Sequence, residues 1–314
     1  MQGKHTCFKA SPVKPILVSA AIAATVCLSP VLAEYVKSGI SLCIGTVIPS
    51  VFPFMIISSF ITVSGYAEGM GRLFYLPMKL LFGADRGEAC AVSIGLLCGY
   101  PTGAITAASM LDRCEISKAR VEWLLTFINI PSAPFVINGV GASMLGSSEI
   151  GVSIYISVLL SAVITGVILK PFHKRHTTYK KTSCQPPPPL SETVTESIAR
   201  ASKNMLSVCA CIITFSVLSG VLCSTLPLND IAKSALSGFL EISSGAKQAA
   251  NLSNATYAHL LCASICAFSG LSVHFQIMSA CRGRGISFVP FFIAKVAQAI
   301  LAPAILSVFL IICR

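Results

Sequence analysis

The sequence has few charged residues. Of its 314 residues only 11% are charged, with 12 Asp and Glu against 23 Lys and Arg, whereas 54% are hydrophobic. A soluble domain carries about 25% charged residues to keep its surface hydrated. Disorder requires low hydrophobicity, so a disordered chain is excluded as well. The composition therefore excludes an ordinary soluble enzyme and predicts an all-α polytopic membrane protein.

Catalytic and metal-binding patterns are also missing. The sequence contains no Gly-x-Ser-x-Gly elbow, no Walker loop and no His-Glu-x-x-His pair. Its 14 cysteines stand singly, without the Cys-x-x-Cys spacing of a zinc site. We interpret them as reduced, small apolar side chains in helix packing. We expect no enzyme activity, no cofactor and no metal site.

Long apolar stretches are abundant. A membrane helix needs about 20 mostly apolar residues, and the alternation typical of a membrane β-barrel is absent. We expect eight hydrophobic segments, at 16–33, 40–63, 89–111, 123–145, 150–169, 204–226, 256–280 and 287–312. The first is interpreted as an uncleaved membrane helix. The alternative is a signal peptide cleaved after Val31-Leu32-Ala33.

Positive charge is concentrated in two places. The first fourteen residues hold three lysines and no acid, and the stretch Lys170–Lys181 holds five Lys and Arg. The positive-inside rule predicts that both regions, the N-terminus included, are cytoplasmic. Because cytoplasmic loops of a membrane protein account for these charges, nucleic acid is not an expected partner.

The expected number of membrane crossings predicts that one apolar segment is a hairpin. Between two cytoplasmic regions an even number of helices must cross, yet five apolar segments lie there. Gly99–Gly103 interrupts the segment 89–111 with Gly-Tyr-Pro-Thr-Gly, and we predict a re-entrant hairpin at this point. The segment 40–63, interrupted by Pro49 and Pro53, is a weaker alternative.

The proline run in 172–203 divides the chain near its middle. We expect an N-terminal segment with the first membrane helix at 1–37 and a first membrane half at 38–171. A cytoplasmic basic and proline-rich linker at 172–203 then leads to a second half at 204–314.

A weak internal repeat relates the two halves. The alignment pairs Gly99 with Gly270, each inside an apolar run, and predicts broken helices near 99–103 and 270–274. Paired interruptions in two halves indicate the substrate site of a transporter. Exposed N–H groups of broken helices attract anions. The alternative is that Gly and Pro merely kink two packed helices.

Polar groups at membrane depth are costly, so each is a functional candidate. Isolated Ser and Thr more often bond their own helix, His274 has the alternative of a satisfied structural histidine, and Glu241 that of an interfacial cap. Glu241 and His274 are predicted gate or coupling residues. The predicted substrate-binding residues are Gly99, Tyr100, Pro101, Thr102, Gly103, Asn129, Ser132, Gly270, Ser272, His274 and Gln276.

Four motifs carry a resemblance to a known family. The stretches Pro49–Phe54, Gly95–Ala104, Asn129–Gly141 and Gly270–Gln276 together resemble the YlbJ family of sporulation integral membrane proteins. The resemblance runs from about residue 38 to residue 310. That family is grouped with proteins that carry the nucleoside recognition or Gate domain.

The resemblance implies a function in an endospore-forming bacterium. Members are tied to sporulation and implied to carry dipicolinic acid, a small anionic solute, across the outer forespore membrane. The alternatives are a non-transporting scaffold for spore assembly and a nucleoside-type transporter. Expected partners are the solute and the lipid bilayer, with further copies of the chain or sporulation membrane proteins as possible additions. The side of the turn Arg282–Arg284 stays open, since its charge favours the cytoplasm whereas an inverted repeat with Gly99 matched to Gly270 places it outside.

Overall fold

The computed structural model describes residues 29–66, 69, 71–72, 75–83, 86–170 and 189–312, and no strand occurs among them. The basic N-terminus and residues 16–28 of the first expected segment lie outside these residues, as do residues 172–188 of the expected linker. The alternative cleavage site Val31-Leu32-Ala33 lies within the first described helix. A helix already begins at Leu190. Residues 190–203 therefore belong to the second half and not to the linker.

The first half opens with one continuous helical run of 35 residues. It consists of α2 (Ser29–Leu42), a π-helical turn η1 (Cys43–Val47) and α3 (Ile48–Val63). The remaining elements are α5 (Tyr75–Phe82), α6 (Arg86–Cys98), α7 (Thr102–Asp112), α8 (Lys118–Ile128), the π-helix η2 (Phe135–Met144) and α9 (Ser148–Leu169).

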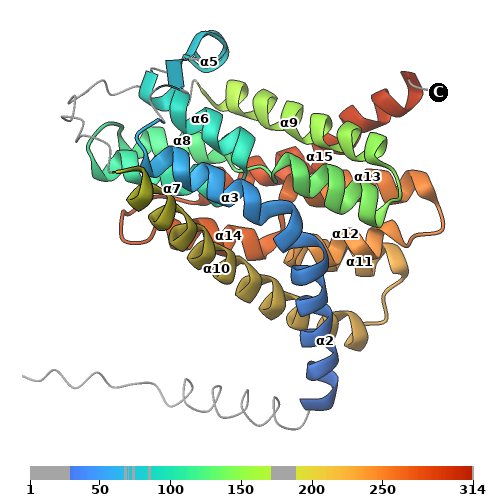
Figure 1. The fold of residues 1–314 in the computed structure, drawn as a ribbon. Helices are drawn as coiled ribbons and strands as arrows, with labels where there is room; N and C mark the ends of the chain where they lie inside the picture. Colours follow the sequence, from blue (N-terminus) through green and yellow to red (C-terminus); the bar gives the residue numbers. More distant parts are fainter. Residues whose placement is uncertain are drawn as a thin grey trace, which may run out of the picture.

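The second half opens with a helix of similar length, α10 (Leu190–Thr225). It is followed by α11 (Asp230–Leu240), α12 (Ile242–Ala250), α13 (Ala255–Phe268), α14 (Gly270–Ala280) and α15 (Val289–Ile312). In Figure 1 the run α2–α3 and helix α10 lie side by side on one face, and α9, α13 and α15 pack together on the other.

Five helical runs are long and apolar enough to cross a membrane: Ser29–Val63, Ser148–Leu169, Leu190–Thr225, Ala255–Ala280 and Val289–Ile312. The predicted all-α polytopic class is therefore confirmed. Three of the eight expected segments are not single helices. Segment 89–111 is divided into α6 and α7, segment 123–145 into α8 and η2, and segment 256–280 into α13 and α14.

The predicted hairpin at 89–111 is present. Helices α6 and α7 pack against each other and are joined by residues 99–101 only. Their arms approach closely at Gly95 and Gly103, because a Cβ on Gly103 would lie 2.9 Å from Gly95 Cα. The chain thus reverses its direction at residues 99–101.

A second hairpin, formed by α11 and α12, was not among the expected segments. Its arms meet at Gly238 and Gly245, where a Cβ on Gly245 would lie 2.1 Å from Gly238 Cα. The connection is the single residue Glu241. Residues 230–250 carry two acids, two lysines and five Ser or Gln side chains, so their hydrophobicity is too low to mark a membrane segment.

Two further helices are broken. The α8–η2 element is interrupted at residues 129–134, and α13–α14 is interrupted at Ser269, where Ser269 and Gly270 have φ of 74° and 70°. Each half therefore consists of a long helix, a hairpin, a broken helix and a single helix. When the two halves are matched element by element, the hairpin tip at Gly99 corresponds to the hairpin tip at Glu241. The helix break at 129–134 corresponds to the break at Ser269–Gly270.

The predicted pairing of Gly99 with Gly270 is therefore wrong. Gly99 lies at a hairpin tip and Gly270 in a broken helix that continues across. Both are glycine-interrupted apolar runs, and a sequence pattern does not distinguish a chain that turns back from one that continues.

One end of the bundle, which we call the basic end, collects the loops with Arg113, Lys118 and Arg284. Arg284 Nη2 lies 2.6 Å from Asp112 Oδ2, and Ser287 N donates to Glu122 Oε1 at 2.7 Å. The turn Arg282–Arg284 therefore lies beside the loop between α7 and α8. Since α8–η2 leaves this end and α13–α14 arrives at it, the turn is on the basic side and the repeat is still inverted.

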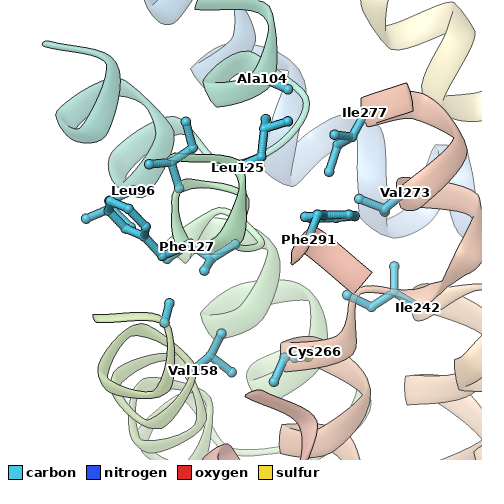
Figure 2. Close-up of a cluster of buried hydrophobic side chains, with 14 of the residues drawn as sticks. Leu96, Ala104, Leu125, Phe127, Val158, Ile242, Cys266, Val273, Ile277 and Phe291 are labelled. Atoms are coloured by element: carbon cyan, nitrogen blue, oxygen red, sulfur yellow. The ribbon is translucent and has the colours of Figure 1, made fainter. Parts of the chain in front are cut away.

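Both halves share one core. Figure 2 shows Ala104 and Leu125 of the first half facing Ile277 and Phe291 of the second, all buried. The two hairpins and the two broken helices are thereby held around the centre of the molecule.

A cavity between four helix breaks

The tip of the first hairpin touches the break of the first broken helix. Tyr100 N donates to Ile130 O at 3.1 Å. Gly99 has φ of 75°, and a Cβ there would lie 2.7 Å from Ser132 N. Only glycine fits this left-handed position at such close range. Two interruptions that are about thirty residues apart are thereby held in contact.

The second half repeats this contact with other residues. A Cβ on Gly270 would lie 2.9 Å from Ile242 N and 3.2 Å from Glu241 Cα. The tip of the α11–α12 hairpin therefore docks onto the break between α13 and α14. All four interruptions of regular helix are arranged in two docked pairs.

A small cavity of about 30 Å³ lies between these pairs. All four breaks contribute to its lining, and η1–α3 and α10 supply an apolar wall. The polar lining residues are Tyr100, Ser132, Glu241, Ser243, Ser272 and Gln276, and the apolar ones are Val47, Val51, Phe135, Val208, Ile212, Ile242 and Val273. Five predicted residues thus meet at one place: four substrate-binding candidates and the gate candidate Glu241.

Four buried polar atoms at this cavity have no hydrogen-bond partner within the described part of the chain. They are the Oγ atoms of Ser132, Ser243 and Ser272 and Oε1 of Gln276. A buried polar group left unpaired costs about 1–3 kcal/mol. Such groups at one cavity indicate a space built for a polar occupant.

Helix N-termini also meet here, and most of them are uncapped. In α7, η2 and α14, the side chain of the residue before the helix accepts no hydrogen bond from the first N–H groups. In contrast, four helices that begin at the ends of the bundle are capped by a side chain: Ser117 for α8, Ser147 for α9, Asn229 for α11 and Asn254 for α13. Helix α10, which begins after Pro189, has no such cap. The first N–H groups of these three half-helices, which carry positive partial charge, thus have no acceptor from a side chain of their cap residue.

Glu241 is the exception among the central N-termini. Its Oε1 accepts from Ser243 N at 2.9 Å and its Oε2 from Ser244 N at 2.6 Å, and the side chain is fully buried. It is a cap for α12, as one interpretation of the sequence held, but it lies at the centre and not at the interface. Glu241 is the one residue with an ionisable carboxyl or amine among the described residues that line the cavity.

Several predicted residues lie beside the cavity without lining it. Pro101 precedes α7, Thr102 is its first residue, and Gly103 packs on Gly95. Asn129 is buried and ends α8, where Nδ2 donates to Leu125 O at 3.2 Å.

His274 faces away from the cavity, into aromatic surroundings. Its ring lies 4.8 Å from those of Phe268 and Phe291. Nδ1 donates to Gly270 O at 2.7 Å, and the buried Nε2 has no partner among the described residues. His274 therefore lies on the side of α14 that is turned away from the cavity.

The sequence interpretation missed Ser243 and Lys295. Lys295 Nζ donates to Asn129 O at 2.5 Å and lies 3.3 Å from Ala267 O, and its side chain is fully buried. It is the single charged residue of the 24-residue helix α15. A lone lysine in an apolar run is itself a signal of function, and it was available from the sequence.

Comparison with known proteins supports the resemblance drawn from the motifs. The chain is 25% identical over 307 residues to the "Sporulation integral membrane protein YlbJ" of Bacillus subtilis (strain 168), which covers 86% of this chain and 75% of that protein. The resemblance to YlbJ is thus confirmed. No protein-family model matches the chain, and the Gate-domain assignment stays a prediction. No solved structure matches it either.

Proposed function

We propose that this YlbJ-like membrane protein acts in sporulation as a transporter, and that it binds a small anionic solute in the cavity between the four breaks. The observation that carries the proposal is the meeting of three uncapped helix N-termini with four unpartnered polar atoms at one cavity. Dipicolinic acid, which the family resemblance suggests, is the first solute to test.

The arrangement of the hairpins favours transport over a purely structural role. Irregular backbone persists at membrane depth only where it is buried in protein or lines a cavity. One hairpin reaches the cavity from the basic end and the other from the opposite end. Movement of one hairpin at a time would open the cavity to one side of the membrane, which is alternating access around a fixed site.

The cavity suits a small planar anion in two respects. Its free N–H groups and hydroxyls can donate to carboxylate oxygens. Its apolar wall, with Val47, Val51, Val208 and Ile212, can contact an aromatic ring. A dicarboxylate with a flat ring offers both surfaces.

Glu241 favours a second candidate, an uncharged nucleoside-type solute. A carboxylate beside a dianion is repulsive, whereas a carboxylate beside sugar hydroxyls accepts hydrogen bonds. The described lining contains no basic side chain that would offset Glu241. The two solutes therefore predict opposite effects of removing this charge.

The experiment is uptake of labelled dipicolinate and labelled nucleosides into proteoliposomes, with wild type and Glu241→Gln. Glutamine keeps one acceptor for the N–H groups of α12. If the solute is dipicolinate, its affinity rises by about tenfold or more, since a unit charge at an effective dielectric constant of ~20 is worth more than 1.4 kcal/mol within several ångströms. If the solute is a nucleoside, its affinity falls. Glu149→Gln, in the first turn of α9 and away from the cavity, is the control.

The scaffold alternative is tested in sporulating cells. Ser132→Ala and Ser272→Ala remove unpartnered hydroxyls from the cavity without adding volume, and Ser153→Ala removes an exposed one. The transporter predicts that the first two lower the dipicolinate content of spores at normal protein levels and the third does not. Unchanged content in all three would instead support a scaffold.

We further propose that the basic end faces the cytoplasm and that the protein resides in the outer forespore membrane. Cys114, an exposed thiol in the loop after α7, tests the orientation. In everted vesicles it should react with an impermeant maleimide, and in intact cells it should not. A Cys114→Ser variant serves as the labelling control, and the reverse labelling pattern would invert the assignment.

A further inference from the structure

The ammonium group of Lys295 holds the two broken helices together. Nζ donates to Asn129 O at 2.5 Å, to Ala267 O at 3.3 Å and to Ser269 Oγ at 3.4 Å. Asn129 follows the last residue of α8, and Ala267 is the residue before the last of α13. The C-terminal carbonyls of a helix are unpaired and carry negative partial charge. One cation therefore joins the negative ends of both half-helices.

Lys295 has no acidic partner among the described residues. The negative partial charges of the carbonyl oxygens at the two breaks stabilise its positive charge instead. Of the groups around it, His274 on α14 interacts with it electrostatically. The other titratable or charged side chains on the elements packed against α15 are Lys118, Arg120 and Glu122 on α8, Glu149 and Tyr155 on α9, and Tyr257, His259, Cys262 and Cys266 on α13.

These contacts lead directly to the cavity. Ser132 and Ser272, which line it, each follow a Lys295 partner by three residues, after Asn129 and Ser269 respectively. A change in the charge of Lys295 therefore acts on both breaks at once, from the side opposite the solute.

In transporters with broken helices, carbonyls at half-helix C-termini coordinate the coupling Na⁺ or H⁺. Here a lysine ammonium fills that position. We infer that Lys295 is a tethered coupling cation, so that solute movement is linked to protonation of its amine and not to Na⁺; this inference rests on the proposed transport function.

The step is a simple proton transfer. The ammonium releases one proton to water and becomes a neutral amine, and the breaks lose the positive charge that holds them. Reprotonation restores the contacts. Because Lys295 has no exposed surface here, the exchange takes place in the conformation in which the breaks have separated.

The first test requires no solute. Purified full-length wild type, Lys295→Arg, Lys295→Ala and Gln298→Ala are unfolded thermally in detergent with sodium, lithium or choline chloride. Gln298 is the matched control, because it lies on the same helix and donates an uncharged hydrogen bond to Thr126 O at 2.7 Å. We expect sodium or lithium to raise the midpoint of Lys295→Ala alone, since an alkali cation enters the vacated carbonyl site. Equal midpoints of Lys295→Ala in sodium and choline would overturn the cation-site assignment.

The second test uses proteoliposomes that contain a pH-sensitive dye and are supplied with dipicolinate. Wild type should move protons with dipicolinate and should not need sodium. Lys295→Arg should unfold like wild type yet take up dipicolinate at least about tenfold more slowly, because a guanidinium binds carbonyls but does not release its proton. Equal uptake by the two proteins, or a sodium requirement of wild type, would overturn proton coupling through Lys295. If wild type takes up no dipicolinate, the proposed function fails for that solute, and the unfolding test still decides the cation site.

Discussion

The two hairpins have the same outline but different attachments. The first, α6–α7, is fixed at its base to α8 by the buried pair Glu88–Arg120, in which Arg120 Nη2 donates to Glu88 Oε2 at 2.9 Å. The second, α11–α12, is held to α10 by neutral hydroxyl pairs, Ser219–Ser237 and Ser216–Ser244, each at 2.8 Å. Their tips differ too, because α7 begins without a side-chain cap whereas Glu241 caps α12.

This difference shows that two hairpins of the same outline can be attached by different chemistry. Breaking a buried ion pair leaves an uncompensated charge and costs several kcal/mol, whereas a neutral hydrogen bond contributes about 1 kcal/mol. The polar link that attaches the second hairpin is therefore cheaper to remove than the ion pair that attaches the first. Three measurements can break or sharpen the comparison.

The largest expected effect comes from Arg120→Ala. It removes the partner of Glu88 and also the stacking of Arg120 on Trp123, whose ring centre lies 3.8 Å from the guanidinium carbon. We expect a loss of about 3–5 kcal/mol of unfolding free energy in detergent. Arg200→Ala, which breaks an exposed pair with Glu196, should cost less than about 1 kcal/mol. Similar losses for the two variants would contradict the role of the buried pair Glu88–Arg120 in attaching the first hairpin.

An intermediate effect is expected from alanine at the two docking glycines. Gly99→Ala and Gly270→Ala each place a Cβ less than 3 Å from backbone nitrogen and force a left-handed alanine. The conformation alone costs about 1–2 kcal/mol, and the collision adds to it. Gly65→Ala has the same left-handed conformation but open space around it, so it reports the conformational cost alone. Thermal unfolding and solute uptake should both separate the first two from Gly65→Ala; equal behaviour would show that the tips are not closely docked.

The smallest effect concerns Asp112 and Arg284, which join the two halves at the basic end. The hydrogen bond from Arg284, with its positive charge, lowers the pKa of the Asp112 carboxyl below its ordinary value. A carboxyl whose folded pKa is depressed stabilises the fold above its unfolded pKa of about 3.9 and loses that contribution as pH falls through the folded value. The midpoint difference between wild type and Asp112→Asn should therefore be constant near neutral pH and disappear at acidic pH. A difference that grows on acidification would contradict the pairing.

Part of the candidate site could be predicted from the sequence. The run Gly99–Gly103 and the count of crossings were enough to predict the first hairpin, because a helix break between two basic loops leaves few topologies. Ser132, Ser272 and Gln276 were found because polar side chains are conspicuous in apolar surroundings. The second hairpin was not found, since its serines and lysines resemble a surface segment until α10, α13 and α14 are packed around it.

The sequence by itself determined that this is a helical membrane protein with interrupted helices, because composition and run length decide which backbone can be surrounded by lipid. Only the tertiary structure decided which interruptions meet. Gly99 docks on the break before Ser132, Glu241 docks on Gly270, and Lys295 joins Asn129 to Ala267. Contacts between residues 28 to 166 positions apart depend on packing geometry, which no local pattern in the chain records.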